Sequence, residues 1–184
     1  MSALCYTPYY MRYVALLRGI NVGGNRKVPM MELRHLFEDM GYTDVSTYIN
    51  SGNVIFSAAV EPHAADIERA MAEQFGFAVD MLIVSQAKLT SVAGATPDEW
   101  TNDAEQKSDV VFLFPDIDTA DILAIIGHNP VVESMLYLPG AIITNISRNN
   151  QPKSSLLRLM GTPLYRRMTI RNVNTVRKLA ALVG

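Results

Sequence analysis

The chain has 184 residues, of which 49% are hydrophobic and 18% are charged, a composition that predicts a packed globular protein of one ordinary domain or two small ones. Cys5 is its single cysteine, which excludes an internal disulfide and any multi-cysteine metal site. No apolar run reaches the roughly 20 residues that a membrane-spanning helix needs, and the first ten residues lack the basic and apolar regions of a signal peptide. We therefore expect a cytoplasmic protein without a membrane partner.

The formal net charge of −2 hides an uneven distribution of charged residues. All 18 acidic residues lie between positions 32 and 133, whereas residues 1–31 and 134–184 carry four and eight basic residues and no acid. If the two ends meet in the fold, they form a positively charged surface suited to an anion. If they lie far apart, the same residues are ordinary solvated charges.

The first half of the chain is predicted to alternate strands and helices in the order β-α-β-β-α-β. Continuous β-branched and aliphatic residues, with a hairpin signal in the middle, indicate the strands. Apolar residues at helical spacing indicate the helices, and Pro29 and Gly41 suit the two ends of the first one. The predicted strands are 11–19, 45–49, 53–58 and 79–84, and the predicted helices are 29–41 and 62–76.

The same order returns in the second half, without detectable sequence identity to the first. Strands are expected at 109–114, 131–138, 141–147 and 167–171, helices at 118–127 and 152–161, and a closing helix at about 172–182. This pattern predicts an α+β fold with two ferredoxin-like β-α-β-β-α-β subdomains in tandem plus a C-terminal helix. The expected division is an N-terminal extension at 1–10, a first subdomain at 11–85, a connector at 86–107 and a second subdomain at 108–184.

The stretch LLRGINVGGN, residues 16–25, joins the first strand to the first helix. It matches neither the Walker phosphate loop nor the G-x-G-x-x-G dinucleotide pattern. Its backbone could still cradle an anion at the start of the helix. In the alternative, its glycines supply positive φ angles and its asparagines bind the backbone of a long connection. The residues concerned are Arg18, Asn21, Gly23, Gly24, Asn25 and Lys27.

A second polar stretch, YINSGN at residues 48–53, separates two predicted strands. Asparagine, serine and glycine are favoured hairpin residues in their own right. Asn50, Ser51 and Asn53 could also orient a ligand. No histidine or acid adjoins Ser51, so the sequence gives no support to a nucleophilic role.

A third stretch, TIRNVNTVRKL at residues 169–179, opens the final helix, where Asn172 is suited to cap the first turn. Capping alone does not explain why Arg171, Asn174, Thr175 and Lys178 gather there, and Asn172 and Asn174 could also orient a ligand. A helix N-terminus beside an arginine is a second candidate phosphate cradle. Structure and function are both open explanations for this stretch.

Signals for established catalytic or metal chemistry are missing from the sequence. The three histidines are scattered without ligand spacing, so no metal site is predicted. No Ser/His/Asp order, paired carboxylates or general base stands out, and the predicted sheets offer few aromatic residues for stacking RNA bases. The sequence names no cofactor, no reaction and no oligomeric state.

The stretches LLRGINVGG and YINSGNV, together with TIRNVNTVRKL, resemble a widespread bacterial family known as domain of unknown function 1697. The resemblance runs from Met11 across nearly the whole chain and implies two ferredoxin-like α+β subdomains. It implies no established reaction. The chain departs from the family pattern at Val173, where relatives usually have tryptophan, and at Ser154-Ser155-Leu156, where they tend to have Ser-Lys-Leu.

Because the outer two polar stretches coincide with the acid-free basic ends, the sequence hypothesis is a shared site. In it, a small phosphorylated or nucleotide-like ligand binds in a cleft between the first β-α loop and the C-terminal helix. The alternative is a non-enzymatic module that binds protein or nucleic acid through the basic ends. A third explanation is that the polar stretches lock the two subdomains together through buried hydrogen bonds.

Overall fold

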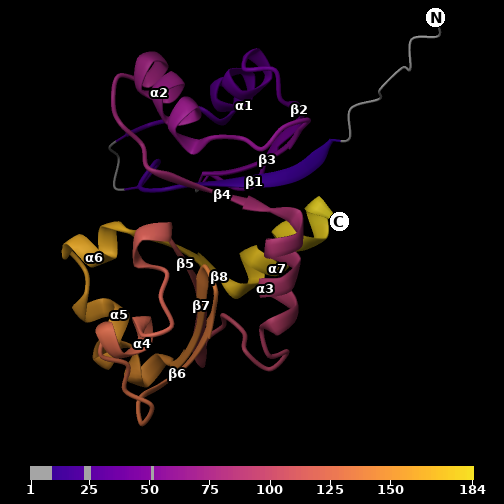
Figure 1. Ribbon diagram of the computed structural model, residues 1–184. Coiled ribbons are helices and arrows are strands. Elements are labelled where there is room, and N and C mark those ends of the chain that lie inside the picture. The colour runs from indigo at the N-terminus through magenta and orange to yellow at the C-terminus, as the bar shows by residue number, and fades with distance from the viewer. Residues whose placement is uncertain (1–9, 23–25, 51) are drawn as a thin grey trace, which may run out of the picture. The chain divides into compact units, whose positions relative to one another are not determined.

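The computed structural model describes residues 10–22, 26–50 and 52–184, and the chain divides into two compact units with the boundary between Gln86 and Ala87 (Figure 1). Each unit contains a four-stranded antiparallel sheet, so the predicted α+β class with two tandem subdomains is confirmed. None of the described helices is both long enough and apolar enough to cross a bilayer.

The first unit has the predicted order of elements. These are β1 (Met11–Leu17), α1 (Met30–Asp39), β2 (Thr43–Thr47), β3 (Asn53–Ala58), α2 (Ala64–Phe75) and β4 (Met81–Ser85). The strand order is β2-β3-β1-β4, and α1 and α2 both cover one face of the sheet. The predicted second strand was wrong by two residues, because the chain leaves the extended conformation at Ile49, whose φ is 51°.

The core of the first unit lies between its sheet and these two helices. Phe56 on β3 packs against Tyr13, Phe37 and Tyr42, with ring centroids 4.7 to 5.8 Å apart. The side chains of Tyr13, Ala15 and Leu17 alternate along β1 toward this core. The end of β1 is therefore packed between the core and its two neighbouring strands, and the first polar loop starts from it.

A helix that was not predicted from the sequence starts at Gln86, the last residue before the boundary, and continues into the second unit. Residues Gln86–Ala95 form α3 within the segment expected to be a connector. The other elements of this unit are β5 (Gln106–Leu113), α4 (Ile122–Ile125), β6 (Glu133–Leu138), β7 (Ala141–Ser147), α5 (Ser155–Arg158), α6 (Pro163–Arg166), β8 (Met168–Asn172) and α7 (Val173–Val183), with 3₁₀ turns at Pro115–Ile117 and Arg148–Lys153.

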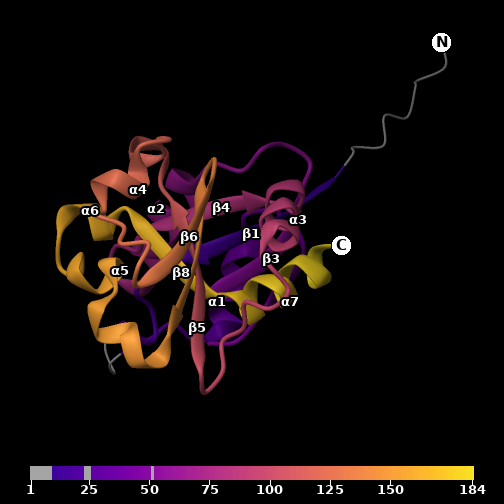
Figure 2. The same ribbon diagram turned by 90° about the horizontal axis from the view of Figure 1, so that it is seen from below.

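The second sheet repeats the strand order of the first, as β6-β7-β5-β8. Its helices lie on both faces, with α4, α5 and α6 on one side and α3 and α7 on the other (Figure 2). Two predicted helices are shorter than expected. The helix expected at 118–127 is the single turn α4, and the one at 152–161 is divided, since Pro152 sits in a 3₁₀ turn before α5.

Candidate functional site

The first polar loop is organised by the side chain of Asn21. Its Oδ1 accepts a hydrogen bond from the Val28 amide at 2.9 Å, and its Nδ2 donates to the carbonyl oxygens of Val28 at 3.0 Å and Asn50 at 3.1 Å. The backbone of Asn21 is left-handed, with φ of 56°, a conformation that asparagine tolerates better than most residues. Asn21 thus closes its own loop and ties it to the second polar stretch.

The second stretch is fixed to the end of β1 through Gly52. The Leu17 amide donates to the Gly52 carbonyl at 2.8 Å, and a Cβ added at Gly52 would lie 2.8 Å from the Leu17 Cβ. With its φ of 78° as well, this position requires glycine. Asn53 is fully buried and donates from Nδ2 to the Tyr48 carbonyl at 3.0 Å. These two residues shape the loop.

An open groove lies beside the joined loops in the first unit. Its volume is about 570 Å³. It is lined by Asn21, Lys27, Val28, Pro29, Met30, Met31 and Asn50. The side chains of Lys27 and Asn50 are exposed. Helix α1 starts at the groove, and its N-cap residue Pro29 provides no side-chain hydrogen bond to the first turn. Backbone N–H groups of a helix start are suited to an anion.

The remaining predicted residues of these loops are placed as follows. Arg18 directly follows β1, is half-buried, and donates its backbone amide to the Asp80 carbonyl at 2.9 Å. The predictions at Gly23, Gly24, Asn25 and Ser51 lie outside the described residues. The structure therefore brings together Asn21 and Asn50, from two of the three polar stretches, and Lys27, which follows the first stretch.

The third polar stretch forms the end of β8 and the start of α7. Asn172 is the predicted cap: its Oδ1 accepts from the Thr175 amide at 2.8 Å. Asn174 is exposed and its Nδ2 reaches the Asn102 carbonyl at 3.4 Å, whereas Thr175 is buried. Each of these contacts lies within the second unit, where they support the helix and its surroundings.

Arg171 is a buried cation of β8, with only 9% of its surface exposed. Its Nη1 donates to the Thr169 hydroxyl at 3.1 Å and to the Ile170 carbonyl at 2.9 Å. Burial lowers the pKa of its guanidinium to about 10, so the group is still charged at neutral pH. The guanidinium of Arg171 therefore stays charged although burial removes most of its contact with water.

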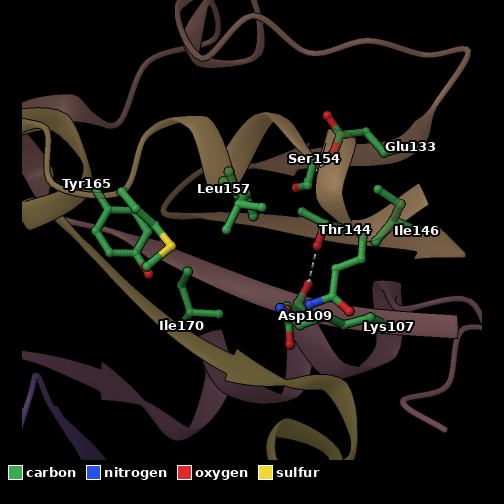
Figure 3. A pocket seen from close by; sticks show the side chains of 12 residues that line it. Lys107, Asp109, Glu133, Thr144, Ile146, Ser154, Leu157, Tyr165 and Ile170 are labelled. Atoms are coloured by element: carbon green, nitrogen blue, oxygen red, sulfur yellow. Dashed lines mark hydrogen bonds and ion pairs between the residues drawn. The ribbon is translucent and has the colours of Figure 1, made fainter. Parts of the chain in front are cut away.

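A pocket in the second unit was not predicted from the sequence. It lies over one face of the sheet, where the register pairs Asp109 with Thr144 and both Lys107 and Glu133 with Ile146. Ser154, at the start of α5, lies at its edge beside Glu133 (Figure 3). The only sequence signal was the departure from the family pattern at Ser154 and its two following residues, which pointed to this region without naming the acids.

Metal ligation finds no support among the residues that the structure describes, since no three histidine, cysteine, aspartate or glutamate side chains cluster there. The new pocket contributes two carboxylates, Asp109 and Glu133, and both are already engaged by neighbouring groups.

The fold defines an α+β protein built from two four-stranded antiparallel sheets, each with the same strand order. Residues 11–137 match a family described as proteins of unknown function, domain of unknown function 1697, and the chain belongs to this family. The expectation from the sequence motifs is confirmed.

One solved structure similar to this chain is that of a conserved bacterial protein from Streptococcus pneumoniae. The two share 28% sequence identity and a TM-score of 0.80, over 96% of this chain and 100% of that one. No curated protein matches the chain. The comparisons give the family and the fold, and the function has to be argued from the sites themselves.

Proposed function

We propose that the protein binds a small anionic ligand, phosphate-like or nucleotide-like, in the groove beside the first polar loop. The proposal rests on the position of the Lys27 side chain. This side chain is exposed at the groove, and among the described residues it forms no ion pair with a carboxylate. An exposed ammonium group beside a helix start presents positive potential to this space, and because Glu32 in the first turn of α1 offsets part of the helix contribution, Lys27 supplies the larger share.

The groove has the chemical character of an anion site. Lys27 supplies a full charge, the first turn of α1 supplies backbone N–H donors, and Asn50 adds an exposed amide. Its volume of about 570 Å³ falls within the range of about 300 to 1,000 Å³ typical of small-molecule sites. Met30 and Met31 give it an apolar wall, which suits the base or sugar of a nucleotide better than inorganic phosphate alone.

The proposal is for binding and not for a reaction. No histidine, aspartate, glutamate or cysteine stands among the described residues that line the groove. Lys27 is the ionisable side chain among these described residues, and the proposal assigns it a charge on the ligand rather than a proton transfer. Positioning and charge stabilisation are the contributions that the described residues can make.

Calorimetric titration of the full chain with pyrophosphate and with ATP tests this proposal. We expect binding that weakens about tenfold in Lys27→Met, the loss of one charge-assisted contact. Arg69→Met is the matched control, because Arg69 is an exposed cation of the same unit that lies outside the groove and pairs with Asp66. Its binding should equal that of the parent.

Two results would overturn the proposal. One is the absence of binding by either probe at millimolar concentration and low salt. The other is equal loss of affinity in the Lys27 and Arg69 variants, which would indicate a diffuse electrostatic effect. Tighter binding of long single-stranded DNA with a steep salt dependence would instead support the nucleic-acid alternative.

Two finer expectations belong with this proposal. The contribution of segment 169–179 to the ligand site stays a prediction, and titration of Asn174→Ala measures it. We also interpret each unit as ferredoxin-like, because antiparallel strands ordered β2-β3-β1-β4 and β6-β7-β5-β8 fit a split β-α-β arrangement.

A further inference from the structure

We propose that the pocket of the second unit is a separate binding site for a small primary amine with a short apolar body. The site is formed on β5, β6, β7 and β8 together with the chain around α5 and α6. It shares no residue with the groove of the first unit, and it does not depend on the anion-binding proposal.

The pocket has a polar end and an apolar end. In Figure 3, Lys107, Asp109, Thr144, Ser154 and Glu133 gather toward one side. Ile146 lies among these polar groups, and Leu157, Tyr165 and Ile170 lie toward the other side. Leu156 and Met160 also line the pocket. A ligand that fills such a space needs a polar head and an apolar tail.

The polar end favours a cationic head group. Its charged side chains are Asp109, Glu133 and Lys107, which sum to a formal charge of −1. Glu133 is 4% exposed and accepts hydrogen bonds from the Ser154 hydroxyl at 3.2 Å and the Ser155 amide at 3.1 Å. Both donors are neutral, and within the described part of the chain Glu133 has no ion pair. The negative charge at this end is therefore not fully balanced.

Asp109 is the group that would receive the ammonium. Its side chain is only 10% exposed, and its Oδ2 lies 3.1 Å from the Nζ of Lys107. Lys107 is 37% exposed and sits two residues away on the same strand, so its ammonium group can move to solvent without changing the fold. A ligand ammonium can then replace it beside Asp109, and Lys107 is in effect an internal competitor.

The available space restricts the ligand to a small molecule. The volume of the pocket is about 70 Å³, far smaller than the volume of about 570 Å³ of the groove in the first unit. An alkylamine of about four carbon atoms is small enough for this volume, whereas a nucleotide is too large.

The first experiment is a titration of the ¹⁵N-labelled full chain with n-butylammonium, followed by NMR. We expect saturable shifts of backbone amides in 107–109, 144–146 and 154–160. Butyrate and butanol are the matched probes, with the same tail and a negative or neutral head. If butyrate saturates the same amides more tightly than butylammonium, the proposal is wrong in the sign of its ligand. If neither charged probe gives saturable shifts there, the pocket is not an amine site.

Two variants give opposite expected results. Asp109→Asn should weaken butylammonium binding about tenfold, because a charge-assisted hydrogen bond is lost. Lys107→Met should strengthen it severalfold, because the internal competitor is removed. A site in which Lys107 binds an anion predicts the reverse order for butyrate. Asp98→Asn, an exposed acid of the same unit outside the pocket, is the control and should leave affinity unchanged.

If Asp109→Asn folds poorly, the Lys107→Met variant still tests the proposed site. Lys107→Met removes the partner of Asp109 while the carboxylate remains, and its expected gain in affinity does not result from misfolding. No gain in that variant, with a native-like NMR spectrum, would overturn the role of Lys107 and with it the proposed site. The weakening of ATP binding by about tenfold that is expected in Lys27→Met does not depend on any of these results, so each proposal can be refuted without the other.

Discussion

Replacing Asn21 with alanine should destabilise the first unit by about 2–3 kcal/mol. The substitution removes three hydrogen bonds, each with a net contribution of about 1 kcal/mol. It also places alanine at a φ of 56°, which costs roughly another 1 kcal/mol. The loop is partly exposed, so water replaces some of the lost partners and the total falls below the simple sum. The Val28 amide is the donor most affected, because Val28 is buried.

The assay combines urea unfolding with native-state hydrogen exchange. Because the chain has two units, global unfolding need not be two-state, whereas exchange of the Val28 amide reports the local opening directly. Asn21→Gly is the control for backbone strain, since glycine adopts positive φ without cost. It should be less destabilised than Asn21→Ala by about 0.5–1 kcal/mol.

An Asn21→Ala free energy of unfolding within about 0.5 kcal/mol of the parent, the range of an ordinary surface substitution, would contradict this role of Asn21. Unchanged exchange at Val28 would have the same meaning. In either case Asn21 would not hold the two loops together, and its amide would be available to a ligand.

Three further predictions concern the glycine, the helix cap and acid stability. Gly52→Ala should destabilise the chain by more than about 2 kcal/mol because its Cβ would clash with Leu17, whereas Gly41→Ala, at similar φ in open space, should cost about 1 kcal/mol in urea unfolding. Asn172→Ala should cost about 1 kcal/mol by removing the cap of α7, and Asn172→Asp should restore most of it. Hydrogen bonds from the Thr101 hydroxyl and two backbone amides lower the pKa of Asp103. The stabilising contribution of this carboxylate is therefore present at neutral pH and is lost as the pH falls below about 4. The Asp103→Asn variant should be less stable than the parent at pH 7, and the two stabilities should converge in acid.

Much of the fold could be predicted because its signals are local. The strands of both sheets show continuous apolar or alternating residues, and turns such as Pro139-Gly140 separate them. Helix α3 escaped prediction because it carries few large apolar residues. Leu89 and Val92 are its buried ones, and its other positions are small or polar with little helical periodicity. Its stability comes from tertiary packing, which a sequence pattern does not reveal.

The candidate sites were less predictable because they depend on contacts across the chain. Asn21 and Asn50 are 29 positions apart and meet only because β1 and β3 pair in the sheet. Asp109 and Glu133 come together through the register of β5, β7 and β6. Nothing in the spacing of these acids suggested a shared pocket, since strand register is fixed by turns and core packing.

The family motifs are best understood by separating the residues that build the loops from those that face solvent. Gly52 and Asn53 are buried, and Asn21 uses all three of its side-chain hydrogen bonds within the loops, so structural demands account for them. The same demands do not account for Lys27 or the side chain of Asn50, which are exposed at the groove that those residues shape. A loop that only had to close would tolerate any solvated side chain at Asn50 and at Lys27, which lies two residues after the LLRGINVGGN stretch. Substitution of Lys27 should therefore leave the free energy of unfolding nearly unchanged and weaken ligand binding. Substitution of Asn21 should instead lower the free energy of unfolding as its primary effect.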